Sequence, residues 1–144
     1  MNHIEHTEIL KLVRIMADFG MLILIWIVQL VIYPSFTKIR AEALVDWHAQ
    51  YTHRVSYLII PLMLMQLGMG IYTAWTTPSI ISGIYLVLIL STWLLTFFIA
   101  VPLHNKISQG EGTDAVLKRL IQTNWPRTVI WTAIFILSLN LFFS

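Results

Sequence analysis

The sequence contains no cysteine among its 144 residues. Disulfides, thiolate metal sites, covalent haem attachment through a cysteine pair and thiol nucleophiles are therefore excluded. Charge is also scarce, because charged residues make up 11% of the chain and hydrophobic residues 58%, with a mean hydropathy of +0.77. No basic run interleaved with aromatic residues is present, so we expect no nucleic-acid partner. This composition lies outside the range of soluble globular proteins and predicts an integral membrane protein in contact with the lipid bilayer.

Four apolar stretches are long enough to cross a bilayer as helices, since a hydrocarbon core about 30 Å thick needs roughly 20 apolar residues. They cover about residues 16–33, 55–75, 80–101 and 125–143. Proline predicts three of their boundaries: Pro34 ends the first, Pro102 ends the third, and Pro126 lies in the first turn of the fourth. We expect one all-α domain over residues 1–144, a four-helix transmembrane bundle with up-down-up-down topology.

The two longer connections also show helical periodicity. Apolar residues recur at helical spacing from Phe36 to Trp47, and again from Val116 to Ile121, while charged residues fall on another face. We expect short interfacial helices in both connections, although the first is equally consistent with an extension of the second transmembrane helix beyond the lipid.

Positive charge is concentrated in and beside these two connections. Only Lys11 and Arg14 lie at the opposite face, whose link between the second and third helices is uncharged. The remaining cations are Lys38, Arg40, Arg54, Lys106, Lys118, Arg119 and Arg127. Because cytoplasmic loops of membrane proteins carry an excess of Lys and Arg, both long connections are expected in the cytoplasm and both termini outside, in the inner or plasma membrane.

Polar and aromatic residues of all four helices are predicted to meet at the face that carries the long connections. The candidate catalytic residues are His48, Asn105, Asn124 and Arg127, and the candidate substrate-binding residues are Tyr33, Trp47, Tyr51, Arg54, His104 and Trp125. Taken singly, these residues have ordinary explanations: the asparagines as helix caps, the aromatic residues as members of an interfacial belt, the histidines as surface groups bound to headgroups or carbonyls, and Arg127 as a side chain that reaches lipid phosphates. Two helix amino-terminal ends also point to this face and add positive potential, which favours an anion such as an enolate, phenolate or carboxylate. Histidine, with an ordinary pKa of about 6.5, can exchange a proton with such a group.

Three short motifs carry a family resemblance: YPSF at 33–36, VPLHN at 101–105 and NWPRT at 124–128. With this layout the chain resembles the anthrone oxygenase-like family of small four-helix membrane proteins. It departs from that pattern at His104, which precedes Asn105, and at Trp125, which follows Asn124 instead of preceding it.

The resemblance implies a lipophilic aromatic substrate, a polycyclic phenol or anthrone-like molecule, which O₂ oxidises to a quinone after deprotonation. The cofactor stays open, because such an enzyme can work without one or with the assistance of a metal. His48 would then act as general base, and Arg127 with Asn105 and Asn124 would hold the oxyanion. The aromatic rings expected to stack on the substrate are Trp47, Tyr51 and Trp125.

Two other classes of function stay open from the sequence. The first is a redox module with haem or a transition metal, for which His48, His53 and His104 supply nitrogen ligands. The second is a non-enzymatic membrane carrier or assembly protein, in which buried polar residues such as Asp18 and Gln66 join helices. We expect an ion pair between Arg14 and Asp18 and an interhelical hydrogen bond from Gln66. Self-association into a homo-oligomer also stays open.

Overall fold

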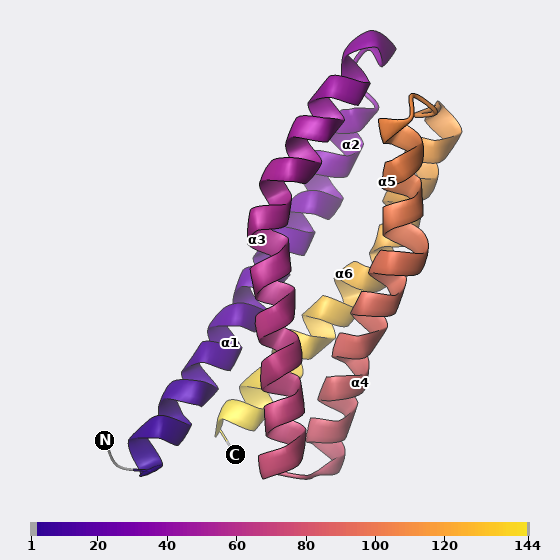
Figure 1. The fold of residues 1–144 in the computed structure, drawn as a ribbon. Helices are drawn as coiled ribbons and strands as arrows, with labels where there is room; N and C mark the ends of the chain where they lie inside the picture. The colour runs from indigo at the N-terminus through magenta and orange to yellow at the C-terminus, as the bar shows by residue number, and fades with distance from the viewer. Residues whose placement is uncertain (1–2, 144) are drawn as a thin grey trace.

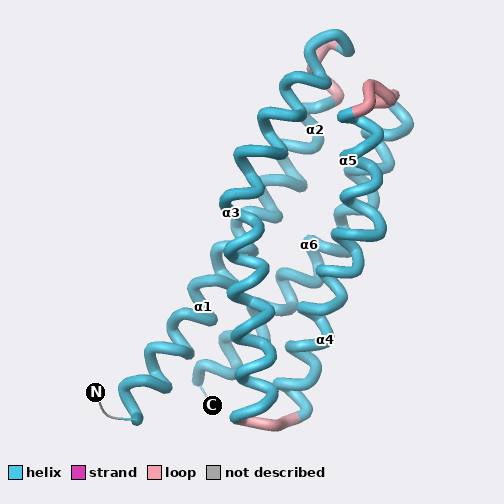
Figure 2. The backbone as a smooth tube through the Cα atoms, viewed as in Figure 1, coloured by secondary structure: helices cyan, strands magenta, loops and turns pink. Residues whose placement is uncertain are grey.

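The computed structural model describes residues 3–143, which form a bundle of long helices (Figure 1). In chain order the elements are α1 (His3–Ile27), the π-helical segment η1 (Val28–Ile32), α2 (Tyr33–Phe36), α3 (Ala41–Thr76), α4 (Ile80–Leu95), the π-helical segment η2 (Thr96–Ala100), α5 (Val101–Ser108) and α6 (Asp114–Phe143). Both termini and the α3–α4 link lie at one end, which we call the termini end (Figure 1). The loops of residues 37–40 and 109–113 lie at the other, the connection end (Figure 2).

Four continuous helical stretches are long and apolar enough to cross a membrane, which confirms the predicted four-helix transmembrane bundle. They are Thr7–Phe36, Ala41–Thr76, Ile80–Ser108 and Asp114–Phe143. Large hydrophobic side chains cover their outer faces, among them Leu30, Ile80 and Val129, each more than half exposed. Such a surface is stable only against lipid, so the protein is an integral membrane protein.

The helices extend well beyond the predicted boundaries, and the separate interfacial helices do not form. Residues 41–54 are the first turns of α3, and residues 114–124 are the first turns of α6. The first connection therefore follows the alternative in which the second transmembrane helix is extended. A continuous helix satisfies its backbone hydrogen bonds internally, whereas each additional break would leave unpaired groups near the membrane surface.

The prolines predicted to mark helix boundaries lie inside continuous helical stretches. Pro34 and Pro102 each follow a π-helical segment and occupy the first turn of α2 and α5, where a missing N–H is tolerated. The wider π-helical turn gives the proline ring space that a regular α-helix lacks. Pro126 lies in the interior of α6 instead of its first turn. These three predictions of a boundary were wrong by a turn or more.

The core is built from large side chains that α1, α3, α4 and α6 direct inward. Tyr85, Ile89, Trp131 and Ile134 are completely buried. Gly70 allows α3 to approach α4 closely, because a Cβ at this position would lie 2.9 Å from Ile89 Cδ1.

A buried polar network ties the helices together in the half of the bundle nearer the termini end. Asp18 accepts hydrogen bonds from Gln66 Nε2 and from the Tyr85 hydroxyl, both at 2.7 Å, and the Trp131 indole donates to Gln66 Oε1 at 3.0 Å. The predicted interhelical hydrogen bond of Gln66 is thus confirmed.

The predicted ion pair between Arg14 and Asp18 does not form within ion-pair distance. Arg14 Nη1 donates instead to the Thr73 hydroxyl of α3 at 3.2 Å. Asp18 instead uses both carboxylate oxygens to join α1 to α3 and α4.

Candidate functional site

A cavity of about 260 Å³ lies between the helices toward the connection end. Six of the ten sequence-predicted site residues line it: Tyr33, His48, Tyr51, His104, Asn105 and Arg127. Its remaining walls are mainly apolar and come from α1, η1, α3, η2, α5 and α6, for example Leu24, Val28 and Trp131. The predicted convergence of polar residues from distant parts of the chain therefore occurs around a real void.

Two histidines from different helices form the centre of a hydrogen-bonded chain along the cavity wall. His48 Nε2 lies 2.8 Å from His104 Nδ1, and the two rings stack with centroids 5.0 Å apart. At one end of the chain the Ser108 hydroxyl lies 3.2 Å from His48 Nδ1, and at the other the Tyr33 hydroxyl lies 2.9 Å from His104 Nε2. The chain thus joins α2, α3 and α5 through four polar side chains.

The hydrogen bonds of these four side chains can run in either of two directions, because a neutral imidazole has one donor and one acceptor nitrogen. In one state Ser108 donates to His48, His48 donates to His104, and His104 donates to the Tyr33 oxygen. In the other state every donor and acceptor is reversed. Each state satisfies all four ring nitrogens, so a proton added at one end can leave at the other when both rings change tautomer.

The position of His48 follows from the packing of the start of α3 on α2. Phe36, which is completely buried, contacts the rings of Trp47, His48 and Tyr51 edge-on, with centroids 5.3–5.7 Å apart. Tyr33 lies one turn before Phe36 on the same helical face, and their centroids are 5.7 Å apart. The YPSF motif therefore orients both Tyr33 and His48 toward the cavity.

Arg127 is a buried cation with no acidic partner. It is 5% exposed, and its Nη1 donates to Asn124 Oδ1 at 2.9 Å while its guanidinium lies 5.1 Å from the centroid of the Trp131 ring. Its Nε is buried without a hydrogen-bond partner. Within residues 3–143 no carboxylate lies within ion-pair distance of it. Burying an uncompensated charge is costly, so an anion in the adjacent cavity is strongly favoured.

Asn124 holds Arg127 in place and does not itself line the cavity. Its Nδ2 donates to Gln29 Oε1 at 2.8 Å, and Gln29 Nε2 in turn donates to the backbone carbonyl of Ile121 at 3.3 Å. The guanidinium therefore has a fixed orientation set by η1 and α6. Asn124 is better described as a positioning residue than as a direct oxyanion contact.

Other predicted site residues lie on the surface of the bundle. Trp47 and Arg54 do not line the cavity but line an open groove beside it, which α3 forms with α1 and η1 and which shares Leu24, Tyr51 and Val55 with the cavity. Trp125 packs edge-on against Trp26 at 5.9 Å with 43% of its surface exposed. Asn105 reaches the cavity only at its exposed rim.

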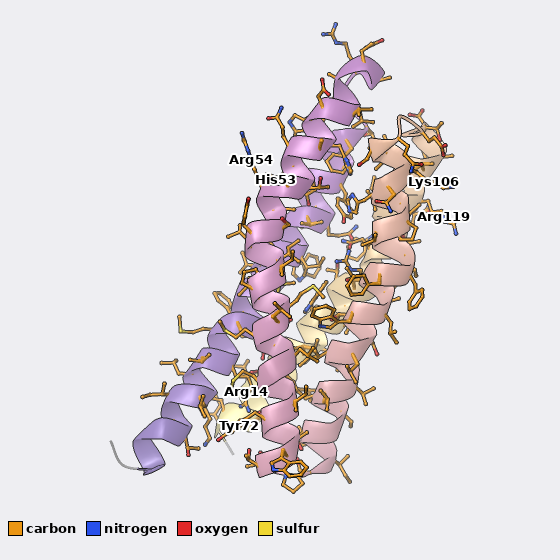
Figure 3. All side chains as sticks on the ribbon, viewed as in Figure 1. Arg14, His53, Arg54, Tyr72, Lys106 and Arg119 are labelled. Atoms are coloured by element: carbon orange, nitrogen blue, oxygen red, sulfur yellow. The ribbon has the colours of Figure 1, made fainter. Side chains whose placement is uncertain are left out.

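His53 does not join the two cavity histidines. It is exposed on the outer face of α3 beside Arg54 (Figure 3), where its Nε2 lies 3.2 Å from the Tyr57 hydroxyl. The part of the chain that the structure describes contains no group of three or more His, Asp or Glu side chains placed to hold a metal ion. The set His48, His53 and His104 is therefore not assembled into one ligand group.

The sequence interpretation did not identify two residues of the site, Ser108 and Trp131. Ser108 lies one turn after His104, and Trp131 lies one turn after Arg127, so each shares a helical face with a residue that was identified. This i, i+4 spacing was the available signal.

The site combines a fixed cation, a proton relay and apolar walls. These are the chemical groups that are needed to hold the anionic form of a lipophilic molecule and to accept the proton that its ionisation releases. Comparison of the chain with known protein-family models, curated proteins and solved structures finds no match.

Proposed function

We propose that the protein is a membrane oxygenase-like enzyme that deprotonates a lipophilic aromatic molecule of the phenol or anthrone class in this cavity and promotes its oxidation by dioxygen. One observation carries the proposal: the uncompensated guanidinium of Arg127 lines the same cavity as the hydrogen-bonded pair His48 and His104. A cation beside a proton acceptor stabilises the product of deprotonation, an enolate or phenolate.

The position of the cavity mouth supports a lipophilic substrate. Ile60 of α3 and Val101 of α5 both line the cavity, yet they are 53% and 38% exposed. In a transmembrane stretch these exposed surfaces face lipid. A substrate dissolved in the bilayer therefore reaches the site between α3 and α5 without crossing water.

In the proposed reaction four polar side chains have roles: Arg127, His48, His104 and Tyr33. Arg127 binds the oxygen on which negative charge develops. His48 Nδ1 accepts the substrate proton after it gives up its hydrogen bond with the Ser108 hydroxyl. This bond lies at the exposed rim and, at 3.2 Å, is the longest of the three hydrogen bonds that link the four side chains. The proton then passes through His104 toward Tyr33 as both rings change tautomer.

Oxidation of the resulting anion consumes one dioxygen molecule. One oxygen atom enters the ring as the second carbonyl of the quinone, and the other leaves as water with the two hydrogens removed from the substrate. The same balance holds for a phenol and for an anthrone. Apolar walls around the cavity exclude competing water from this step.

The charge distribution supports one orientation of the bundle in the membrane. Exposed cations such as Lys38, Lys106 and Arg119 lie at the connection end, and Figure 3 shows Lys106 and Arg119 there. This end is proposed to face the cytoplasm of an inner or plasma membrane, with both termini outside.

The experiment uses anthrone as the probe substrate with the purified full chain in lipid nanodiscs. The wild-type protein is expected to form anthraquinone with one O₂ consumed per product. Arg127→Gln should lower the rate by about 10²-fold or more, as loss of one oxyanion donor does, and His48→Gln by a comparable factor. The matched control is Arg54→Gln, which removes the same charge from the outer groove and should leave the rate unchanged.

The outcomes separate the parts of the proposal. Equal turnover by wild type, Arg127→Gln and His48→Gln, with all three folded by circular dichroism, would exclude this cavity as the active site. Saturable anthrone binding by the wild type without oxygen consumption would refute the oxidation step and favour a non-enzymatic carrier.

A further inference from the structure

A second cavity, of about 700 Å³, lies at the termini end of the bundle. It is bordered by α1, the end of α3, the link of residues 77–79, the start of α4 and the last turn of α6. It shares no lining residue with the cavity that contains His48 and His104. The two cavities therefore lie in opposite halves of the bundle.

The feature that points to a ligand is the side chain of Arg14, which lines this cavity. Arg14 is only 4% exposed, and Nη1 donates to the Thr73 hydroxyl at 3.2 Å. Its Nε and Nη2 are buried and have no hydrogen-bond partner. Figure 3 shows Arg14 on α1 close to Tyr72 on α3. A nearly buried guanidinium with two unused donor atoms beside an open cavity is prepared for an anionic ligand.

The other groups around the cavity favour negative charge. Lys11 lies on the rim and pairs at 3.3 Å with Glu8, one turn away. Among the side chains of residues 7–143, none that lines the cavity is acidic. The Tyr72 hydroxyl, which donates no hydrogen bond within residues 3–143, adds a further donor. Asp18 lies one turn deeper, where Gln66 and Tyr85 occupy its oxygens.

The apolar part of the lining determines the class of anion. Leu10, Met69, Ile81 and Leu141 form the walls beside the cationic groups. A volume of this size is typical of sites for molecules much larger than a simple inorganic ion. The position at the end of the transmembrane helices is the depth of lipid headgroups.

We infer that this cavity is a binding site for a phosphate group, held by Arg14 and Lys11, with the Tyr72 hydroxyl as an additional donor. The planar guanidinium binds phosphate oxygens through two parallel N–H groups, and Nε with Nη2 is the pair of donors that Arg14 has available. The phosphate belongs either to the headgroup of an anionic phospholipid or to a free phosphate ion. The inference stands independently of the proposed oxidation chemistry, because it uses none of the same residues.

The experiment measures thermal unfolding of the full chain with two probes. One probe is inorganic phosphate added to protein in neutral detergent, and the other is phosphatidylglycerol mixed into phosphatidylcholine nanodiscs. Each probe that binds should raise the Tm of the wild-type protein. In Arg14→Gln the apparent affinity for that probe should fall about tenfold or more, the usual effect of losing a charged hydrogen-bond donor. Arg40→Gln, which removes an exposed arginine at the connection end, is the matched control and should respond like the wild type.

The pattern of responses identifies the source of the phosphate group. A response to phosphatidylglycerol alone assigns a lipid headgroup, and a response to inorganic phosphate in detergent assigns a free ion. The inference is overturned when neither probe raises the wild-type Tm, or when Arg14→Gln responds as strongly as Arg40→Gln. If Arg14→Gln does not fold, Lys11→Gln at the partly exposed rim replaces it: a severalfold weaker response supports the site, and an unchanged response overturns it.

Discussion

Replacing Gln66 by methionine should destabilise the bundle strongly without changing its shape. The Gln66 amide joins three helices, because it donates to Asp18 of α1 at 2.7 Å and accepts from the Trp131 indole of α6 at 3.0 Å. Methionine has a similar volume and fills the same space, so the packing term stays small. The substitution leaves a carboxylate oxygen and an indole N–H buried without these partners. Interhelical hydrogen bonds in membranes contribute about 0.6–1.7 kcal/mol, and a buried unsatisfied partner costs about 1–3 kcal/mol.

We therefore expect a loss of about 2–4 kcal/mol in the free energy of unfolding for the two bonds together. The assay is reversible unfolding in mixed micelles with increasing SDS, followed by far-ultraviolet circular dichroism. The matched control is Gln122→Met on α6, where the glutamine is exposed and its side chain makes no hydrogen bond to residues 7–143. Its unfolding free energy should change by no more than about 0.5 kcal/mol. If Gln66→Met lowers the free energy of unfolding by less than about 1 kcal/mol, or by no more than the control does, the two hydrogen bonds of Gln66 do not contribute the stability stated above.

Two further predictions concern helix packing and orientation. Gly70→Ala should lower the Tm, because its Cβ would lie 2.9 Å from Ile89 Cδ1 at a cost of about 1–3 kcal/mol. Gly68→Ala, with no atom within 4 Å of its Cβ, should leave the Tm unchanged or raise it. Equal effects of the two substitutions on the Tm would contradict the close approach of α3 and α4. In this cysteine-free chain, a membrane-impermeant maleimide added to intact cells should label Thr77→Cys at the termini end and spare Gln109→Cys at the connection end. The reverse labelling pattern would invert the proposed topology.

The sequence was sufficient to predict the number and class of the helices, because apolar runs of this length have no other stable structure in lipid. It was not sufficient to predict their ends. Three prolines indicated helix boundaries. The π-helical segments η1 and η2, however, widen the backbone just before Pro34 and Pro102, and Pro126 lies within α6. A π-helical turn depends on tertiary packing, so local patterns do not reveal it.

The sequence was sufficient to predict which helix ends contribute to the candidate site. It was not sufficient to predict which side chains at those ends point into the cavity. Tyr33, His48 and Arg127 all line the cavity, whereas Trp47 and Trp125, from the same helix ends, lie on the outside. A shift of one residue turns a helical side chain by about 100°, and the long helices have no polar stripe wide enough to fix which face is buried. Only packing against the neighbouring helices determines that face.

The two buried arginines give the two ends of the bundle different capacities for binding an anion. Arg14 lies one helical turn from the carboxyl group of Asp18 on α1, and an opposite charge at this spacing partly compensates the guanidinium. Arg127 is held by the neutral side chains of Asn124 and Trp131 and has no such compensation within the described chain. Since the effective cost of a buried unpaired ion is several kcal/mol, an anion that contacts Arg127 relieves more of that cost than one that contacts Arg14. If the proposed reaction takes place, charge that develops on the substrate would therefore gain most from the protein in the cavity at the connection end, and the cavity at the termini end would suit a ligand that arrives already charged.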